Sequence, residues 1–111
     1  MSWTVLVHPL AKKELAALTT QEKGAVDNAM KKLEAIGPAL GHPYSSAVQS
    51  SDRIRELRPR AGRSPWRAFY RRIDDVFLVG SVGPEAQVDS RLFNKAVRAA
   101  EKRINEVEKN S

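Results

Sequence analysis

The chain has 111 residues, a hydrophobic fraction of 41% and a formal net charge of +6, which predicts a single basic domain over residues 1–111 with a core of ordinary size. It has no cysteine and two histidines, which excludes disulfides and thiolate chemistry and argues against a zinc site, so no cofactor is expected. No apolar run approaches the roughly 20 residues that span a bilayer, so we expect a soluble, cytoplasmic protein with no membrane partner.

The first third of the chain shows one strand signal followed by two helical signals. Residues Trp3–Val7 are mostly β-branched or apolar and predict a short strand. Apolar residues at helical spacing from Pro9 to Leu18 predict a short helix. A capping-box pattern at Thr19 opens a second helical stripe, which ends at Gly37. The two helices are therefore expected to form an αα-hairpin.

The remaining two thirds predict a loop, three strands and a final helix. Residues 38–52 sustain neither periodicity and predict a long loop. Residues Ile54–Arg58 and Trp66–Ile73 alternate as strands do, and the apolar run Val76–Val82 is typical of an inner strand. A helix follows from Asp89 or the next residue. The expected fold class is α+β, with a small antiparallel four-stranded sheet in the order β-α-α-β-β-β-α.

Arginines are concentrated in the three consecutive strands. Eight lie between Arg53 and Arg72, with no lysine among them. The guanidinium group is planar, permanently charged and able to bind phosphate oxygens through two donors, so this pattern indicates a surface for nucleic acid. A solvated sheet face with salt bridges to nearby acids is the alternative interpretation.

The predicted order of elements and three short motifs resemble a known family. The motifs are Leu57-Arg58, Trp66–Tyr70 and Ser81–Gly83, followed by a helix that contains Ala96-Val97. With them the chain resembles the RelE/ParE superfamily of bacterial toxins, and especially its HigB-like or phage Gp49-like branch. The resemblance implies a RelE-like curved sheet backed by helices, metal-independent cleavage of mRNA on the ribosome, inhibition of translation, growth arrest, and an antitoxin.

Metal-free RNA cleavage requires a base for the 2′-OH, positive charge for the phosphorane and an acid for the 5′ oxygen. By resemblance, Arg67 matches the sheet arginine of the family and Arg58 the basic residue of the preceding strand. Arginine suits the stabilising role but stays charged and cannot move protons. The tyrosine that many members carry on the last helix is Phe93 here, so the proton-transfer groups do not carry over. The substitutes considered are Lys95, Glu85, Asp89 and the two histidines, and Arg58, Arg67 and Lys95 are the predicted catalytic residues.

The RNA surface is expected on the face of the Trp66–Ile73 strand that carries Arg67, Phe69 and Arg71, because side chains alternate along a strand. The residues predicted to bind RNA are Arg55, Arg60, Arg63, Phe69, Arg71 and Arg72.

The expected partners are mRNA, the ribosome and an adjacently encoded helix-turn-helix antitoxin. Two alternatives remain open: a ParE-like toxin that poisons DNA gyrase, and a catalytically silent module that binds RNA or the antitoxin. The silent module is indicated by Phe93 and by the acidic segment Glu85–Asp89.

Overall fold

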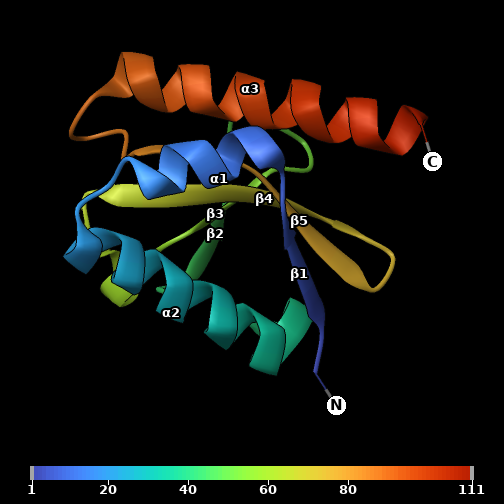
Figure 1. The fold of residues 1–111 in the computed structure, drawn as a ribbon, viewed down its shortest axis with the longest axis horizontal. Coiled ribbons are helices and arrows are strands. Elements are labelled where there is room, and N and C mark those ends of the chain that lie inside the picture. Colours follow the sequence, from blue (N-terminus) through green and yellow to red (C-terminus); the bar gives the residue numbers. More distant parts are fainter. Residues whose placement is uncertain (1, 111) are drawn as a thin grey trace.

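The computed structural model describes residues 2–110, in which five strands form one sheet with α-helices on both of its faces (Figure 1). Residues 1 and 111, the two ends of the expected domain, lie outside the described residues. The strands are β1 (Thr4–Val7), β2 (Ser45–Ala47), β3 (Arg55–Leu57), β4 (Trp66–Ile73) and β5 (Val76–Pro84). The helices are α1 (Pro9–Ala16), α2 (Thr20–Ile36) and α3 (Ser90–Lys109), with short 3-10 segments η1 (Gly37–Ala39) and η2 (Pro59–Gly62). The predicted α+β class is confirmed.

The sheet has the order β1-β5-β4-β3-β2 and differs in two respects from the four antiparallel strands predicted. The additional strand, β2, lies inside the segment predicted as a loop and pairs antiparallel with β3, Ser45 facing Leu57. Strand β1 pairs in parallel with β5, Thr4 facing Val76, so the sheet is mixed. Strand β2 has only three residues, too few to show a period, and it is held by a partner strand rather than by its own pattern.

Side-chain caps begin all three helices, and they explain where each one starts. Thr19 Oγ1 accepts a hydrogen bond from the Glu22 amide at 3.3 Å at the start of α2, as the capping-box pattern predicts. Asp89 does the same for Leu92 at 2.9 Å at the start of α3. At the start of α1, His8 Nδ1 accepts from the Leu10 amide at 3.1 Å, which gives this histidine a structural role.

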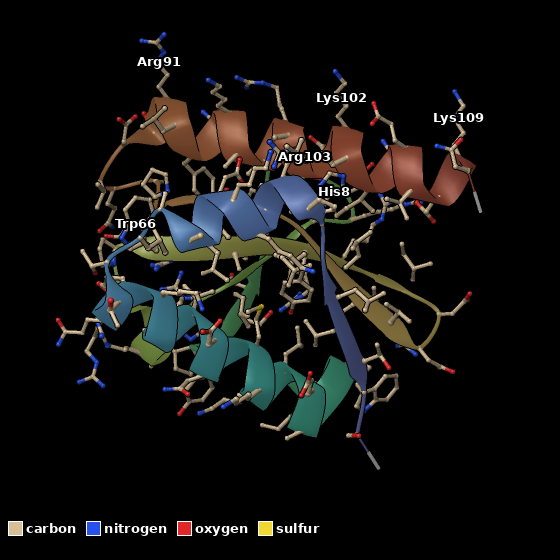
Figure 2. All side chains as sticks on the ribbon, viewed as in Figure 1. His8, Trp66, Arg91, Lys102, Arg103 and Lys109 are labelled. Carbon is tan, nitrogen blue, oxygen red and sulfur yellow. The ribbon has the colours of Figure 1, made fainter. Side chains whose placement is uncertain are left out.

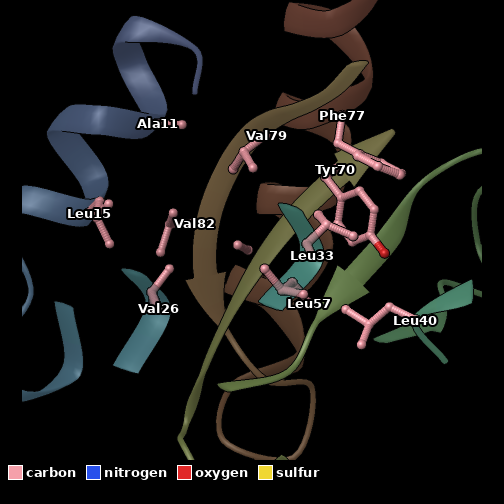
Figure 3. Close-up of a cluster of buried hydrophobic side chains, with 11 residues drawn as sticks. Ala11, Leu15, Val26, Leu33, Leu40, Leu57, Tyr70, Phe77, Val79 and Val82 are labelled. Atoms are coloured by element: carbon pink, nitrogen blue, oxygen red, sulfur yellow. The ribbon is translucent and has the colours of Figure 1, made fainter. Parts of the chain in front are cut away.

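Both faces of the sheet are covered by helices, so the core has two parts. One part lies between the sheet and helices α1 and α2 (Figure 3), and the other lies between the sheet and α3. The first includes Leu15, Val26, Leu33, Leu57, Tyr70 and Val79, and the second includes Phe69, Leu78, Val97, Ala100 and Ile104. Strand β5 is buried along nearly its whole length, as its continuous apolar run predicts.

Helix α3 lies very close to β5 because two glycines leave room for it. A Cβ atom on Gly80 would come within 2.9 Å of the Ala100 Cα, and one on Gly83 within 2.7 Å of the Ala96 Cβ. The Ser81 hydroxyl donates to the Ala96 carbonyl oxygen at 2.6 Å, and Arg103 donates to the Gly80 carbonyl oxygen at 2.9 Å. These contacts fix α3 on the sheet. Its opposite face projects the charged side chains labelled Arg91, Lys102 and Lys109 away from the sheet (Figure 2).

Candidate functional site

Arg67 is the buried centre of an arginine–glutamate network formed by Arg58, Glu56, Arg67 and Glu85. The Arg67 side chain is 3% exposed. Its Nη2 donates to Glu85 Oε2 at 2.6 Å and to the Gly62 carbonyl oxygen at 3.3 Å. Its Nη1 donates to the carbonyl oxygens of Ser64 and Trp66 at 2.7 and 2.9 Å. Arg67 therefore ties the start of β4 to the residue that follows β5 and to the turn that precedes β4.

Arg58 is the more accessible arginine of this network, with 23% of its side chain exposed. Its Nη1 donates to Glu56 Oε1 at 2.6 Å, and its Nε donates to the Pro43 carbonyl oxygen at 3.1 Å. The Arg67 Nε lies 3.5 Å from the same Glu56 oxygen, an ion-pair distance without a hydrogen bond. Glu56 thus brings Arg58 and Arg67 together, at the pair of positions that the sequence singled out.

Burial lowers the pKa of Arg67, and the nearby charge of Arg58 lowers it further, while Glu85 and Glu56 act in the opposite direction. The guanidinium group nevertheless keeps its charge, because arginine is not deprotonated in proteins. The network accordingly holds two positive charges and two carboxylates that face one another. Such an arrangement can stabilise an added negative charge through Arg58 and accept a proton on a glutamate.

A left-handed turn at η2 carries two further arginines of the predicted set. Arg60, Ala61 and Gly62 have φ angles of 55°, 57° and 92°, a backbone conformation that residues other than glycine rarely adopt. The Arg60 guanidinium pairs with Glu22 of α2 at 2.9 Å, and Arg63 Nε donates to the Arg60 carbonyl oxygen at 3.1 Å. A Cβ on Gly62 would lie 2.6 Å from Arg58 Nη2, so the turn also packs against the network.

A cleft of about 550 Å³ opens between this turn and helix α2. We call it the η2 cleft; its lining includes Arg58, Arg60, Arg63, Lys32, Tyr44 and Leu57. Lys32 Nζ lies 3.9 Å from the centroid of the Tyr44 ring, a cation–π contact that the sequence did not indicate. No Asp or Glu of the described residues lines the cleft, so its walls favour an anionic ligand.

The face of β4 that was expected to be open to RNA is covered by α3. Phe69 is fully buried and meets Phe93 edge to face with ring centroids 5.2 Å apart, so its ring presents no free surface for a base. Arg71 is 6% exposed and binds Asn105 at 3.1 Å and Glu108, both on α3. The alternation predicted from the sequence holds, but this face packs against α3 because its residues belong to the second part of the core.

The remaining predicted residues lie apart from the network. Arg55 and Arg72 lie at the opposite end of the strand pair, near residues Pro38–Gly41. Lys95 is exposed on α3, and no hydrogen bond or ion pair joins it to the network within residues 2–110. The contacts of Glu56 and Glu85 with Arg67 depend on strand register and on the end of β5, and the sequence supplied only the acidic residues themselves.

Within residues 2–110 no group of three or more His, Cys, Asp and Glu side chains is placed to hold a metal ion. Among the same residues, no helix combines the length and apolar character needed to cross a membrane.

The sequence also matches a known protein family. Residues 13–79 match the family described as phage derived protein Gp49-like (DUF891), which is more than half of the chain. The chain belongs to this family. Comparison with curated proteins gives no match.

Solved structures of RelE-type toxins share the fold of this Gp49-like chain, as the sequence motifs predict. A mutant of the E. coli toxin RelE in the free state has a TM-score of 0.64 at 19% identity, covering 88% of this chain and 97% of the mutant chain. A chain of the RelBE2 toxin–antitoxin complex from Mycobacterium tuberculosis has a TM-score of 0.57 at 20% identity, covering 77% and 100%. A chain of the E. coli DinJ–YafQ complex has a TM-score of 0.58 at 15% identity, covering 80% and 99%. The Gp49-like chain therefore has the fold of the RelE superfamily.

Proposed function

We propose that this Gp49-like chain is the toxin of a type II toxin–antitoxin pair and acts as a metal-independent, ribosome-dependent mRNA endonuclease. The observation that carries the proposal is the contact of Arg58 and Arg67 with one glutamate, Glu56, beside a basic cleft. The family and the RelE fold support the toxin assignment, and the site supports the reaction type.

In the proposed reaction a carboxylate removes the 2′-OH proton, the 2′ oxygen attacks the adjacent phosphorus and the bond to the 5′ oxygen breaks. Arg58 is the group that we assign to the phosphorane, because it is the exposed arginine of the network and lines the η2 cleft. We assign the base to Glu85, which is 24% exposed against 13% for Glu56 and contacts only Arg67 within the network. Arg67 is a positioning residue in this scheme, because its donors are used within the protein.

The leaving 5′ oxygen needs a proton, and Lys95 remains the residue proposed to supply it. Lys95 is exposed on α3, and among residues 2–110 no hydrogen bond or ion pair joins it to the network. A Lys95→Met variant that retains full cleavage would remove it from the scheme.

The proposed partner is a cognate antitoxin with a helix-turn-helix segment, encoded beside this protein. Two of the similar structures are toxin–antitoxin complexes, which supports this choice. A basic protein of net charge +6 is attracted to an acidic antitoxin segment, and such a segment would compete with RNA for the η2 cleft.

The test is induction of the protein in bacteria that lack the partner. We expect growth arrest with cleaved messages, relief by Arg58→Gln, and no relief by Arg91→Gln, a matched loss of charge on the outward face of α3. Continued growth with soluble, folded protein would refute the proposal. Continued translation with DNA damage signalling would instead select the gyrase-poisoning alternative.

A catalytically silent binding module is the second candidate, and one observation favours it. Arg67 makes four hydrogen bonds inside the protein and is 3% exposed, so it cannot reach a phosphate without breaking the network. Purified protein that binds programmed ribosomes or RNA and yields no cut message, at any enzyme concentration, would select this candidate.

A further inference from the structure

The arginines of the β3–β4 region fall into two groups according to their partners. Four are paired with glutamates, and the other four have no carboxylate partner among the described residues. The paired set is Arg58, Arg60, Arg67 and Arg71, and the unpaired set is Arg53, Arg55, Arg63 and Arg72. Three of the unpaired set, Arg53, Arg55 and Arg72, line one cleft, which is separate from the arginine–glutamate network.

This second cleft, which we call the arginine cleft, has a volume of about 440 Å³. It lies between residues Pro38–Gly41 and the ends of β3 and β4, and its lining includes the buried side chains of Leu40, Tyr70 and Phe77. Among residues 2–110, no Asp or Glu contributes to the lining. Three unpaired positive charges at one concave surface raise the local concentration of anions.

Two of these arginines are held in place by contacts that use only their inner nitrogen. Arg55 Nε donates to Ser45 Oγ at 2.9 Å, and Ser45 shares a buried hydrogen bond of 2.5 Å with the Tyr70 hydroxyl. Arg72 Nε donates to the Asp74 carbonyl oxygen at 2.7 Å, and its guanidinium lies 5.1 Å from the ring centroid of Trp3. Within the described chain the terminal nitrogens of both side chains have no acceptor, so each presents a positioned pair of donors.

The lining favours a phosphate-bearing strand over a peptide. Peptide segments gain most of their affinity from apolar anchors that enter pockets. The apolar lining residues Leu40, Tyr70 and Phe77 are buried, at 5%, 2% and 3% exposure, whereas Arg53 and Arg72 are exposed. A single strand of RNA needs positive charge along its backbone rather than an apolar anchor.

We propose that the arginine cleft binds backbone phosphates of single-stranded RNA, as a second contact next to the η2 cleft. Leu40 lines both clefts, so the two lie on either side of the segment that contains it. The choice of RNA as the ligand rests on the proposed function. Cleavage is assigned to the arginine–glutamate network. The arginine cleft raises the affinity for RNA and fixes the position of the RNA strand relative to the network.

The experiment measures binding of a fluorescent 2′-O-methyl RNA dodecamer to the full chain at several salt concentrations. The blocked 2′ oxygen cannot attack, so binding is measured whether or not the protein cleaves. Loss of two phosphate contacts in the variant with Arg55→Gln and Arg72→Gln should reduce the slope of log affinity against log salt by about 1.4 and weaken binding roughly 25-fold at 0.1 M salt. Arg91→Gln, the same charge loss on α3, should leave the slope within about 0.3 of the wild type.

An unchanged slope in the folded double variant would overturn the inference. If the double variant loses binding to a poly-glutamate peptide but binds RNA as the wild type does, the cleft takes a protein ligand and the inference is wrong. Arg72→Gln alone provides a second variant, because Arg72 is exposed and its removal leaves the Ser45–Tyr70 contact in place. If cleavage and growth arrest are absent while the slope still falls, the proposed function fails and the arginine cleft stands.

Discussion

Replacement of Arg67 by alanine should destabilise the protein far more than replacement of Arg58. Arg67 is 3% exposed and makes four hydrogen bonds, three of them to carbonyl oxygens between Gly62 and Trp66. Its removal takes the side-chain donors away from these acceptors and leaves the Glu85 and Glu56 carboxylates without their common partner. Breaking one side of a buried ion pair typically costs about 3–5 kcal/mol of unfolding free energy.

For a domain of this size, a loss of that magnitude corresponds to a fall in Tm of roughly 12 °C or more. It would also consume much of a total stability of about 5–15 kcal/mol. Arg58 is 23% exposed, and its ion pair is screened by solvent, so Arg58→Ala should cost about 1 kcal/mol. Arg67→Ala should therefore reduce activity in cells largely through loss of folded protein.

Urea unfolding monitored by far-UV circular dichroism measures both variants beside the wild type. Adding Glu85→Gln to Arg67→Ala should restore part of the loss, because it removes a carboxylate left without its partner. If Arg67→Ala lies within about 1 kcal/mol of Arg58→Ala, the description of Arg67 as a buried centre of the network is wrong. The growth-arrest assay should accordingly be carried out with Arg58 variants, because these are expected to stay folded.

Three further predictions concern the glycines and one buried hydroxyl. Gly80→Ala should destabilise the protein by about 1–3 kcal/mol, since its Cβ would meet the Ala100 backbone; faster hydrogen exchange in α3 would show that the helix is displaced. Gly62→Ala places a Cβ at φ 92° and 2.6 Å from Arg58 Nη2, so it should cost about 1 kcal/mol or more and reduce cleavage, and normal cleavage kinetics would contradict this. Tyr70→Phe should lower the free energy of unfolding by about 1 kcal/mol, measured by thermal unfolding, because the Ser45–Tyr70 hydrogen bond is lost. RNA binding should weaken only slightly, because Ser45 keeps its bond to Arg55; a full loss of RNA binding would contradict this.

The fold was largely predictable because its elements carry local signals. Helix α2 begins at the Thr19 cap and β5 matches a continuous apolar run, and both were expected within a few residues. Strand β2 was missed because its serine-rich sequence has no period of its own. The parallel pairing of β1 with β5 joins segments more than sixty residues apart, a relation that no local pattern contains.

The arginine-rich character of the candidate site was predictable from the sequence, but the surroundings of each arginine were not. The concentration of arginines indicated an anion-binding surface, and the resemblance singled out Arg58 and Arg67, which the structure joins through Glu56. The face assigned to RNA was chosen by its charge, whereas α3 covers it because Phe69 belongs to the core. Which arginines are paired depends on register and on helix placement, and this sorting becomes visible only in three dimensions.

The segment between the η1 turn and Tyr44 borders both basic clefts, so we expect its length to influence the spacing between them. Leu40 contributes to both linings, while Tyr44 borders only the η2 cleft. Inserting or deleting one residue in this segment would alter that spacing without removing a single arginine. Related chains that differ in the length of this segment would then bind RNA strands of different minimum length, because a strand must be long enough to contact both clefts.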